Sequence, residues 1–522
     1  MVKARRDARR RRQAGPGSGD TRCNLIRFLS LSAALPALLS GPAWGAKWEV
    51  VPTLSVVETY TDNLSLTPNA SKQSDWVTQV IPGISVAATG ARLKFYATYA
   101  PEVTYYARGK RDNQVFHRGN ATGSAELAKQ LLFVDGGAKV DQYSVSLQGP
   151  LTTSNVNTTA NRSTVKTSFI SPYLQRDFGS DLKAEARFTY SVANSDDTSS
   201  LSNSVANRIN LRLTSGPKYK VLTWDLAYSR ETINYETQGT TDIEVSSLNV
   251  RRLITPTVGL LAQGGYEYYK NGLFPPTEGQ TWSAGLDWAP SPHTRLAATA
   301  GERFFGNAYA FDFRHRTRLT TWSVGYSQNV TTTRSEFFIP AIASTAGYLD
   351  TLFAARFPDP VARQKAVEEF IARTGLPPSL GTPINVFATQ LFLVNAWNAS
   401  AGILGVRNVL IANIFGLTSE GLAGDFVLPT APNASIQTGM SLLWNWRMTA
   451  RNAWNLAAGY SRNESPNTGE IGYLTNVTMG LTRQFQPRLS GSLSYRFQQN
   501  DSNVSASDYT ENAVFATLRM RF

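Results

Sequence analysis

Apolar and polar residues alternate one by one along most of the chain beyond residue 47. Ile209, Leu211 and Leu213, for example, are separated by arginine or asparagine, and the same period of two recurs over 311–316 and 493–498. A period of two places successive side chains on opposite faces of an extended strand. The sequence therefore predicts many β-strands, each with one apolar and one polar face.

The last twelve residues, 511–522, have the clearest pattern of this kind. Their apolar face carries Val514, Ala516, Leu518, Met520 and Phe522, and their polar face carries Thr517, Arg519 and Arg521. A closing strand that ends on an aromatic residue resembles the sorting signal of bacterial outer-membrane β-barrels. We therefore interpret Leu518, Met520 and Phe522 as a signal for the barrel-assembly machinery. The alternative is an ordinary amphipathic strand at the end of a soluble protein.

The N-terminal 46 residues have the order of a secretory signal peptide. A long arginine-rich stretch precedes a largely apolar run over 24–40, and small residues follow, with Ala43 and Ala46 at the two positions before the expected cleavage site. The apolar run is too short, and too interrupted by Pro36, to cross a bilayer as a helix. We predict export, with residues 1–46 as the signal peptide and 47–522 as the mature barrel.

Removal of the signal segment changes what charge and cysteine content imply. Of the net charge of +13, residues 1–46 contribute +7, which leaves +6 for the mature chain. Basicity therefore does not indicate a nucleic-acid partner. The single cysteine, Cys23, also lies in this segment, so disulfides, thiolate metal sites and cysteine nucleophiles are excluded from the mature protein.

The positions of the tryptophans separate a membrane barrel from a soluble sandwich. Trp282 and Trp288 lie on one strand face about 20 Å apart, close to the height of an outer-membrane barrel's apolar band. Trp444 and Trp446 also share an apolar face. Indole rings favour the membrane interfaces, where the N–H group can reach the headgroups. We predict that these four rings face lipid and lipopolysaccharide, the alternative being an aromatic-rich soluble core.

The spacing of turn signals gives the strand number. Short connections such as Gly90-Ala91, Gly179-Ser180 and Gln486-Pro487 alternate with long polar links such as 61–74 and 147–160. Outer-membrane barrels have short periplasmic turns and long outer loops. We predict an all-β, antiparallel transmembrane barrel of 18 to 22 strands, with 22 as the best count and both termini in the periplasm.

One segment, 332–387, does not follow the strand pattern and is predicted to be a helical insertion. Asp359-Pro360 has the residues of a helix start, and Gly375 with the prolines that follow marks its end. A preceding helix over about 344–357 supplies Leu349, Leu352 and Phe353 as apolar partners. By strand parity the hairpin belongs to an extracellular loop, where it acts as a lid or plug over the mouth or is a packed loop without a gating role.

Several segments resemble a known family. The start of the mature chain (Lys47-Trp48-Glu49-Val50-Val51-Pro52, then Glu58-Thr59-Tyr60-Thr61-Asp62-Asn63-Leu64), the stretch 317–336 and the ending Tyr509-Thr510-Glu511-Asn512 with Phe522 are similar to outer-membrane proteins that accompany the exosortase (PEP-CTERM) sorting system. The resemblance implies a Gram-negative outer-membrane barrel associated with exopolysaccharide gene clusters. It also implies periplasmic polysaccharide-export components as partners, and it carries over no catalytic residue.

The sequence has no motif that indicates an enzyme, a cofactor site or a metal site. The three histidines, His117, His293 and His315, occur in neither a Gly-x-Ser-x-Gly nor a His-Glu-x-x-His motif. His117, beside an outer loop, is the only candidate base. The paired acids Asp196-Asp197 and Glu368-Glu369 are typical of solvated loops.

The polar strand faces supply the candidate functional residues. By their phase, eight charged residues point into the lumen: Arg208, Arg212, Asp312, Arg314, Arg316, Arg496, Arg519 and Arg521. Bare arginines would concentrate anions and bind carboxylates in pairs of hydrogen bonds. The alternative is that they pair with lumenal acids such as Asp225 and only stiffen the wall.

Two functions remain open at this point. The first is a channel for export of exopolysaccharide or another anionic polymer. The second is a non-conducting surface receptor or structural anchor that binds extracellular polymer or protein. An energy-coupled receptor would need a plug domain before the barrel, whereas here strands begin close to the predicted cleavage site.

Overall fold

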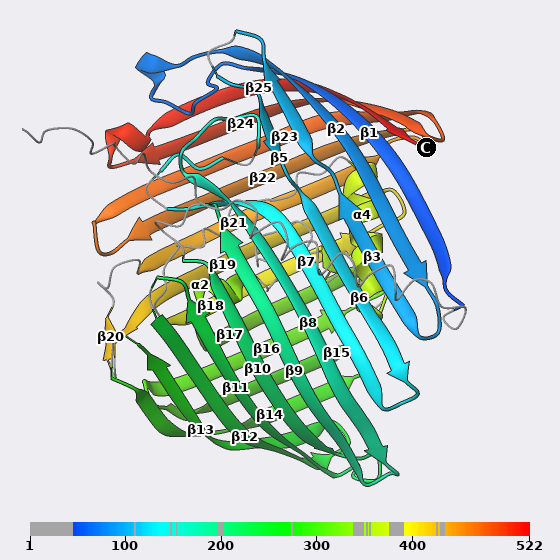
Figure 1. Ribbon diagram of the computed structural model, residues 1–522, viewed down its shortest axis with the longest axis vertical. Coiled ribbons are helices and arrows are strands. Elements are labelled where there is room, and N and C mark those ends of the chain that lie inside the picture. Colours follow the sequence, from blue (N-terminus) through cyan, green and yellow to red (C-terminus); the bar gives the residue numbers. More distant parts are fainter. Residues whose placement is uncertain are drawn as a thin grey trace, which may run out of the picture.

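The computed structural model describes residues 45–108, 111–146, 149–152, 154–196, 202–237, 239–272, 275–337, 349–350, 353, 357–374, 391–423, 426–428 and 434–522. Most of the predicted signal segment, including Cys23, lies outside these residues. The described strands form one antiparallel sheet, and its first and last members, β1 and β25, pair with each other. This pairing closes the sheet into a barrel (Figure 1).

The strand bounds follow the alternating segments of the sequence. In the first half they are β1 Lys47–Thr61, β2 Asp75–Thr89, β3 Leu93–Tyr99, β4 Glu102–Tyr106, β5 Gln114–Phe116, β6 Gly119–Ala128, β7 Leu132–Ser144, β8 Arg162–Phe178, β9 Leu182–Ser195, β10 Ser204–Ser215, β11 Leu222–Tyr235, β12 Gly239–Thr255 and β13 Val258–Asn271. In the second half they are β14 Thr277–Ser291, β15 Thr294–Arg303, β16 Gly306–Arg316, β17 Thr320–Thr332, β18 Leu391–Leu404, β19 Asn408–Ala423, β20 Phe426–Leu428, β21 Ser435–Arg447, β22 Asn452–Ser465, β23 Glu470–Gln486, β24 Leu489–Ser502 and β25 Tyr509–Arg521.

The wall has 22 strands, counted over the described part of the chain. β3 and β4 both pair with β2 and are two parts of one interrupted strand, and β5 and β6 continue each other in the same way. β20 pairs only with β19 and extends that strand's hairpin. The predicted fold class and best strand count are therefore confirmed.

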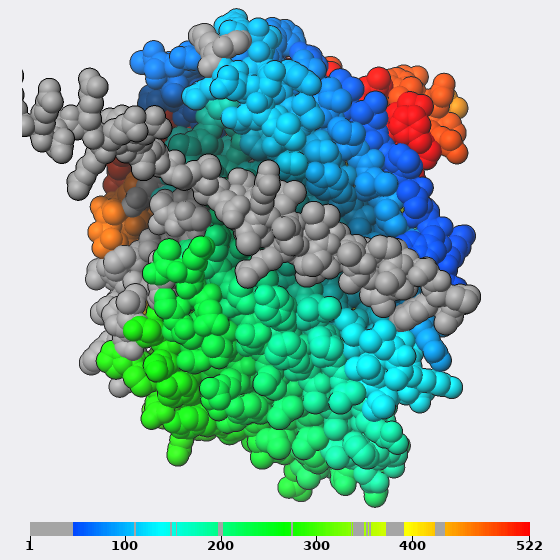
Figure 2. Space-filling view, in the orientation of Figure 1, coloured from blue at the N-terminus to red at the C-terminus, as the bar shows by residue number. Residues whose placement is uncertain are grey.

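The two faces of each strand differ as the alternation predicts. On β10, Ile209 and Leu211 are 46% and 47% exposed on the outside of the barrel. On β25, Leu518 and Met520 are exposed in the same way, and Phe522 donates its backbone N–H to the carbonyl of Pro52. Aliphatic side chains that face outward in such numbers belong in hydrocarbon, which is the environment of an outer-membrane barrel. Figure 2 shows the strands coloured cyan to green as one continuous outer surface.

The barrel has one end with tight turns and one end with long connections. Gly179 occupies the left-handed region, with φ of +61°, in the three-residue turn between β8 and β9. Glycine adopts this conformation without strain. The described start of β1 and Phe522 lie at this short-turn end. The connections that follow β1, β7 and β17 lie at the opposite, long-loop end.

The connection between β17 and β18 agrees with the predicted helical insertion at the start of the helix but differs from it in where the helix lies. It begins at the long-loop end with α2 (Thr333–Glu336) and contains α4 (Pro360–Thr374). Asp359 caps α4 by accepting a hydrogen bond from the backbone N–H of Ala362 at 2.9 Å, as its position before Pro360 predicts. However, α4 does not lie over the mouth. In Figure 1 it lies between the front and back walls, where its side chains contact lumen-facing residues close to the short-turn end.

The strand alternation could not predict this position, because parity fixes only where the connection leaves the wall. Gly375 and the two prolines after it, together with most of the predicted preceding helix, lie outside the described residues. No helix in the described part of the chain is both long and apolar enough to cross a bilayer.

Candidate functional site in the barrel lumen

The wall arginines predicted to face the lumen mostly make ion pairs with acids on neighbouring strands. Arg208 pairs with Glu231, and Arg212 pairs with Asp225 at 2.5 Å. Arg314 pairs with Asp312 of the same strand at 3.0 Å. Arg208 and Glu231 are directly paired positions in the register of β10 and β11, whereas Asp225 lies diagonally across from Arg212 on the same two strands. These pairs neutralise much of the positive charge that the sequence suggested.

The remaining predicted arginines differ in their surroundings. Arg496 is buried and pairs with Glu511 at 2.8 Å, whereas the exposed Arg521 lies 3.6 Å from Glu49. Arg316 forms no ion pair within 4 Å with any described acid, and Arg519 is half-buried on the same face as Arg521. At least five of the seven arginines therefore have an acidic partner within the described part of the chain.

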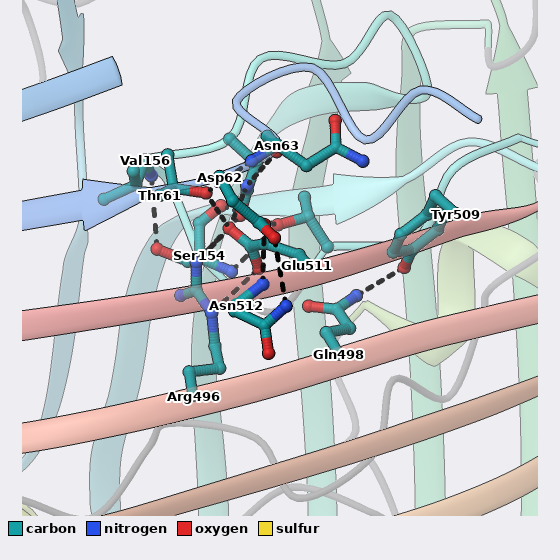
Figure 3. Close-up of polar contacts among 12 residues, drawn as sticks. Thr61, Asp62, Asn63, Ser154, Val156, Arg496, Gln498, Tyr509, Glu511 and Asn512 are labelled. Atoms are coloured by element: carbon teal, nitrogen blue, oxygen red, sulfur yellow. Dashed lines mark hydrogen bonds and ion pairs between the residues drawn. The ribbon is translucent and has the colours of Figure 1, made fainter. Parts of the chain in front are cut away.

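A buried polar network occupies the long-loop end of the lumen (Figure 3). Its centre is the carboxylate of Glu511, which accepts hydrogen bonds from the side chains of Thr61, Asn157 and Arg496 at 2.6 to 3.1 Å. The Glu511 side chain is fully buried. Because both charges are paired and multiply hydrogen-bonded, the network satisfies the conditions under which a buried ion pair is stable.

Asn157 belongs to the connection between β7 and β8, residues 145–161, and its described residues contact β24 and β25. The backbone carbonyl of Leu151 accepts a hydrogen bond from Gln498 at 2.5 Å and another from the hydroxyl of Tyr509. On the other side, Asn155 donates to Glu102 at 2.6 Å. We call this connection the mouth loop. It joins β24 and β25 to β4 through its own side chains.

The insertion is anchored at the same end of the lumen through α2. Arg334, 2% exposed, donates hydrogen bonds to the side chains of Ser204 and Ser191 at 2.9 and 2.8 Å. It also lies 3.7 Å from Glu231. Burial lowers the pKa of the Arg334 guanidinium, although the charge of Glu231 opposes this effect. The first turn of the insertion is thereby fixed to β9, β10 and β11.

The far part of the insertion, α4, is seated at the short-turn end by ion pairs. Lys94 of β3 pairs with Asp359, and Lys365 pairs with Glu49 of β1 at 2.6 Å. Burial acts to raise the pKa of Asp359, but the hydrogen bonds from Lys94 and the Ala362 N–H outweigh it, so the pKa is lowered. All four charged side chains of these pairs keep substantial exposure, between 29% and 45%.

The opposite face of α4 packs on an apolar patch of the wall. Val367 and Phe370 form a cluster with Leu349, Ile411 and Leu443. Leu349 and Phe353 were predicted as partners from the preceding helix, and Phe353 meets Phe370 with ring centroids 5.7 Å apart. The third predicted partner, Leu352, lies outside the described residues. A lumen wall with apolar side chains at one site indicates that the helix has a built seat there.

Glu368 lies on the side of α4 that faces β3 and β6. Burial raises the pKa of its carboxyl, and hydrogen bonds from Gln364, Thr98 and Tyr96 oppose the increase. Glu368 therefore favours the protonated form more than an exposed glutamate does.

A cavity of about 530 Å³ lies beside the start of α4 at the short-turn end. Its lining comes from the turn between β2 and β3, from the lumen faces of β3, β6, β7, β8 and β9, and from α4 itself. The side chains that shape it include Lys94, Phe133, Asp135, Tyr173, Arg187 and Asp359. Its volume lies within the range of small-ligand sites in proteins.

The other predicted residues lie outside the lumen. Trp282 and Trp288 are exposed on the outer face of β14. Trp444 and Trp446 stack on each other on the outer face of β21, with centroids 6.1 Å apart. Of the histidines, His117 hydrogen-bonds the exposed Tyr99 through Nδ1 at 2.7 Å, and His315 hydrogen-bonds Thr294. His293 lies in the tight turn after β14. Among the described residues, no three histidine, cysteine or acidic side chains gather in a metal-binding arrangement.

Sequence reasoning missed the mouth loop, Arg334 and the residues of the cavity. Long-range contacts of the mouth loop leave no periodic signal. Phe133 and Tyr173 had a usable signal, because both are aromatic residues on the polar phase of their strands.

The comparisons with known proteins show the fold. No protein-family model matches this sequence, and no curated protein is significantly similar to it. Among solved structures, it is similar to the FrpB iron transporter of Neisseria meningitidis. The F5-1 variant in its apoprotein form gives a TM-score of 0.51 at 10% identity, over 90% of this chain and 81% of that one. The F3-3 variant gives 0.50 at 9% identity, over 90% and 81%.

At such low identity the likeness extends to the barrel architecture and no further. The chain has the wall of a large outer-membrane barrel, and its lumen contents must be interpreted from its own residues.

Proposed function

We propose that the protein is a gated outer-membrane channel that assists export of exopolysaccharide in an exosortase-type system, with α4 as the gate. The observation that carries this proposal is the position of α4. It belongs to a connection that leaves the wall at the long-loop end, yet it is seated at the short-turn end of the lumen.

The contacts of α4 suit a part that moves. Its two ion pairs to the wall are exposed and contribute little, about 0 to 1 kcal/mol each. Its apolar contact is a small cluster at a single site, and one buried side chain, Glu368, hydrogen-bonds to Thr98 and Tyr96 of β3. In contrast, α2 is held by a buried arginine. A segment fixed through α2 and held at α4 by these few contacts can swing away from its seat without leaving the barrel.

The orientation and the cargo are parts of the same proposal. We place the short-turn end in the periplasm, as short turns indicate for this class of barrel. The polysaccharide cargo is supported by the resemblance of the start, middle and end of the chain to exosortase-associated barrels. The preference for anionic cargo rested on bare lumenal arginines, and their ion pairs weaken that argument.

Single-channel conductance in planar bilayers tests the proposal. Thr332 and Leu391 are directly paired in the register of β17 and β18, so an Asn-Gly turn can replace residues 333–390 without shifting either strand. We expect small, brief openings from the mature protein and a large, steady conductance from this variant. If this variant shows no conductance although its heat-modifiable mobility on gels shows that it is folded, the channel proposal is wrong.

A covalent crosslink that holds α4 in its seat provides the matched control. The mature chain lacks cysteine, so cysteines introduced at Glu49 and Lys365 are the only thiols available to a short bifunctional maleimide. The crosslinked protein should stay closed, and each single-cysteine variant treated with the reagent should open at least as readily as the parent, since it has lost only the ion pair.

The second candidate is a non-conducting receptor or anchor. The mouth loop favours it, because its buried network fixes a loop across the outer end of the lumen. Silence from the insertion-free variant, together with binding of extracellular polymer to the intact protein, would favour this function over the channel.

A further inference from the structure

The geometry points to the cavity beside α4 as a binding site for an uncharged pyranose unit of a polysaccharide. This inference deepens the proposed function, since it names the sugar chemistry recognised next to the gate.

The first argument is a ladder of side chains across four neighbouring strands. Phe133 faces Glu126 on one side and Tyr173 on the other, and Tyr173 faces Arg187, each as directly paired strand positions. The rings of Phe133 and Tyr173 stack with centroids 5.1 Å apart and planes 15° apart. The Arg187 guanidinium covers the other face of Tyr173 at 3.7 Å.

This arrangement leaves the second face of Phe133 for a ligand. Tyr173 covers one face of that ring, and Glu126 on the other side is drawn to the turn, where it accepts a hydrogen bond from the backbone N–H of Gln130 at 2.5 Å. Phe133 lines the cavity. The apolar face of a pyranose, which carries several C–H groups, is complementary to the electron-rich face of an aromatic ring.

The second argument is the charge balance of the lining. It contains three basic residues, Arg92, Lys94 and Arg187, and three acidic ones, Glu126, Asp135 and Asp359. Arg187 pairs with Asp135 at 2.8 Å, and Lys94 pairs with Asp359. Paired charges offer no net attraction to an anion. They still offer N–H donors and carboxylate acceptors side by side, which suits hydroxyl groups that donate and accept at once.

The third argument is location. The cavity lies at the short-turn end of the lumen, because Arg92 in the turn between β2 and β3 lines it. Asp359, Pro360 and Val361 of the gate line it as well. A sugar bound there contacts both the wall and the start of α4, so its arrival is coupled to the position of the gate.

The experiment uses titration calorimetry on the folded mature protein with two probes, the neutral oligosaccharide cellopentaose and the acidic trigalacturonate. We expect cellopentaose to bind and trigalacturonate to bind at least tenfold more weakly. Phe133→Ala should weaken cellopentaose binding about tenfold, through loss of the ring face. Ser124→Phe, which fills the cavity and removes no contact of the ladder, should weaken it similarly.

The matched control is Phe305→Ala. Phe305, in the turn between β15 and β16 at the long-loop end, also lies beneath an arginine, with the Arg303 guanidinium 4.8 Å from its ring, but it does not line the cavity. Its variant should bind as the parent does. Stronger binding of trigalacturonate, equal effects of Phe133→Ala and Phe305→Ala, or no binding of either probe would each overturn the inference. The conductance of the insertion-free variant is measured separately, so failure of the sugar site is distinguishable from failure of the channel.

Discussion

The two ends of the lumen are held by the same kinds of side chain in opposite surroundings. At the long-loop end, the Arg496 and Glu511 side chains are 7% and 0% exposed and share a network with Asn157 of the mouth loop. At the short-turn end, the ion pairs of α4 join side chains that are 29 to 45% exposed. Removing one member of an ion pair costs much free energy where water is excluded, and little where water can solvate the remaining charge. The comparison supports the proposal that α4 moves while the mouth loop stays in place.

The largest effect is expected from Glu511→Ala. The substitution leaves the buried Arg496 guanidinium without its acid, and it removes the acceptor used by Thr61 and Asn157. We expect a loss of about 3–5 kcal/mol in the free energy of unfolding, measured by urea titration in detergent. Glu49→Ala, the matching change at the other end, should cost less than about 1 kcal/mol. Equal losses would remove the distinction between the two ends.

The next effect concerns the apolar seat of α4. Phe370→Ala removes a ring that packs on Phe353 and the Leu349 cluster, which should weaken seating by about 3 kcal/mol. Because this seat is not part of the strand pairing, the unfolding midpoint of the barrel should hardly change, while open time in bilayers should increase strongly. A large decrease in barrel stability without longer openings would indicate that α4 is a structural support.

A smaller effect is expected from the ion pairs. Lys94→Ala and Lys365→Ala should each lengthen open time by less than about fivefold, which corresponds to an exposed pair. Raising the salt concentration from about 0.1 M to 1 M shortens the screening length from about 10 Å to 3 Å and should mimic both substitutions in the parent. In the double variant Lys94→Ala/Lys365→Ala, raising the salt concentration should not lengthen the open time further. A salt effect that persists there would indicate that other charges hold α4.

The smallest effect is a pH dependence from Glu368. Burial raises its pKa in the seated state, so its contribution to seating is complete at pH values below the unseated pKa and is lost as pH rises through the seated pKa. The lowered pKa of Asp359 acts in the opposite sense, with a contribution that is lost as pH falls. Open time should therefore increase with pH in the mildly acidic range, and Glu368→Gln should abolish that increase. An increase that survives in Glu368→Gln would assign it to another group.

The barrel could be predicted from the sequence because its signals are local. Strand alternation, turn residues and the terminal Phe522 each depend on a few neighbouring positions, and together they gave the strand count. The start of α4 at Asp359-Pro360 was predictable for the same reason. A helix cap is read from adjacent residues.

The contents of the lumen could not be predicted in the same way. Glu511 meets Thr61 and Asn157 across 450 and 354 residues of sequence, and no local pattern encodes such contacts. The phase of the strands predicted which face carried Arg208 and Arg212, but it could not predict Glu231 as a partner until the register of β10 and β11 was known. The depth of α4 depends on side chains from walls that only the closed barrel brings together.

The pairing of Thr332 with Leu391 has a consequence for how such barrels can diversify. The wall is complete on either side of the insertion, so the length and sequence of the intervening segment are not constrained by strand register. A gene encoding this wall can exchange one insertion for another, or lengthen the present one, without a compensating change in the strands. Sequence differences among barrels with this wall should accordingly be concentrated between these two residues, because this segment can be replaced without a change in the strands.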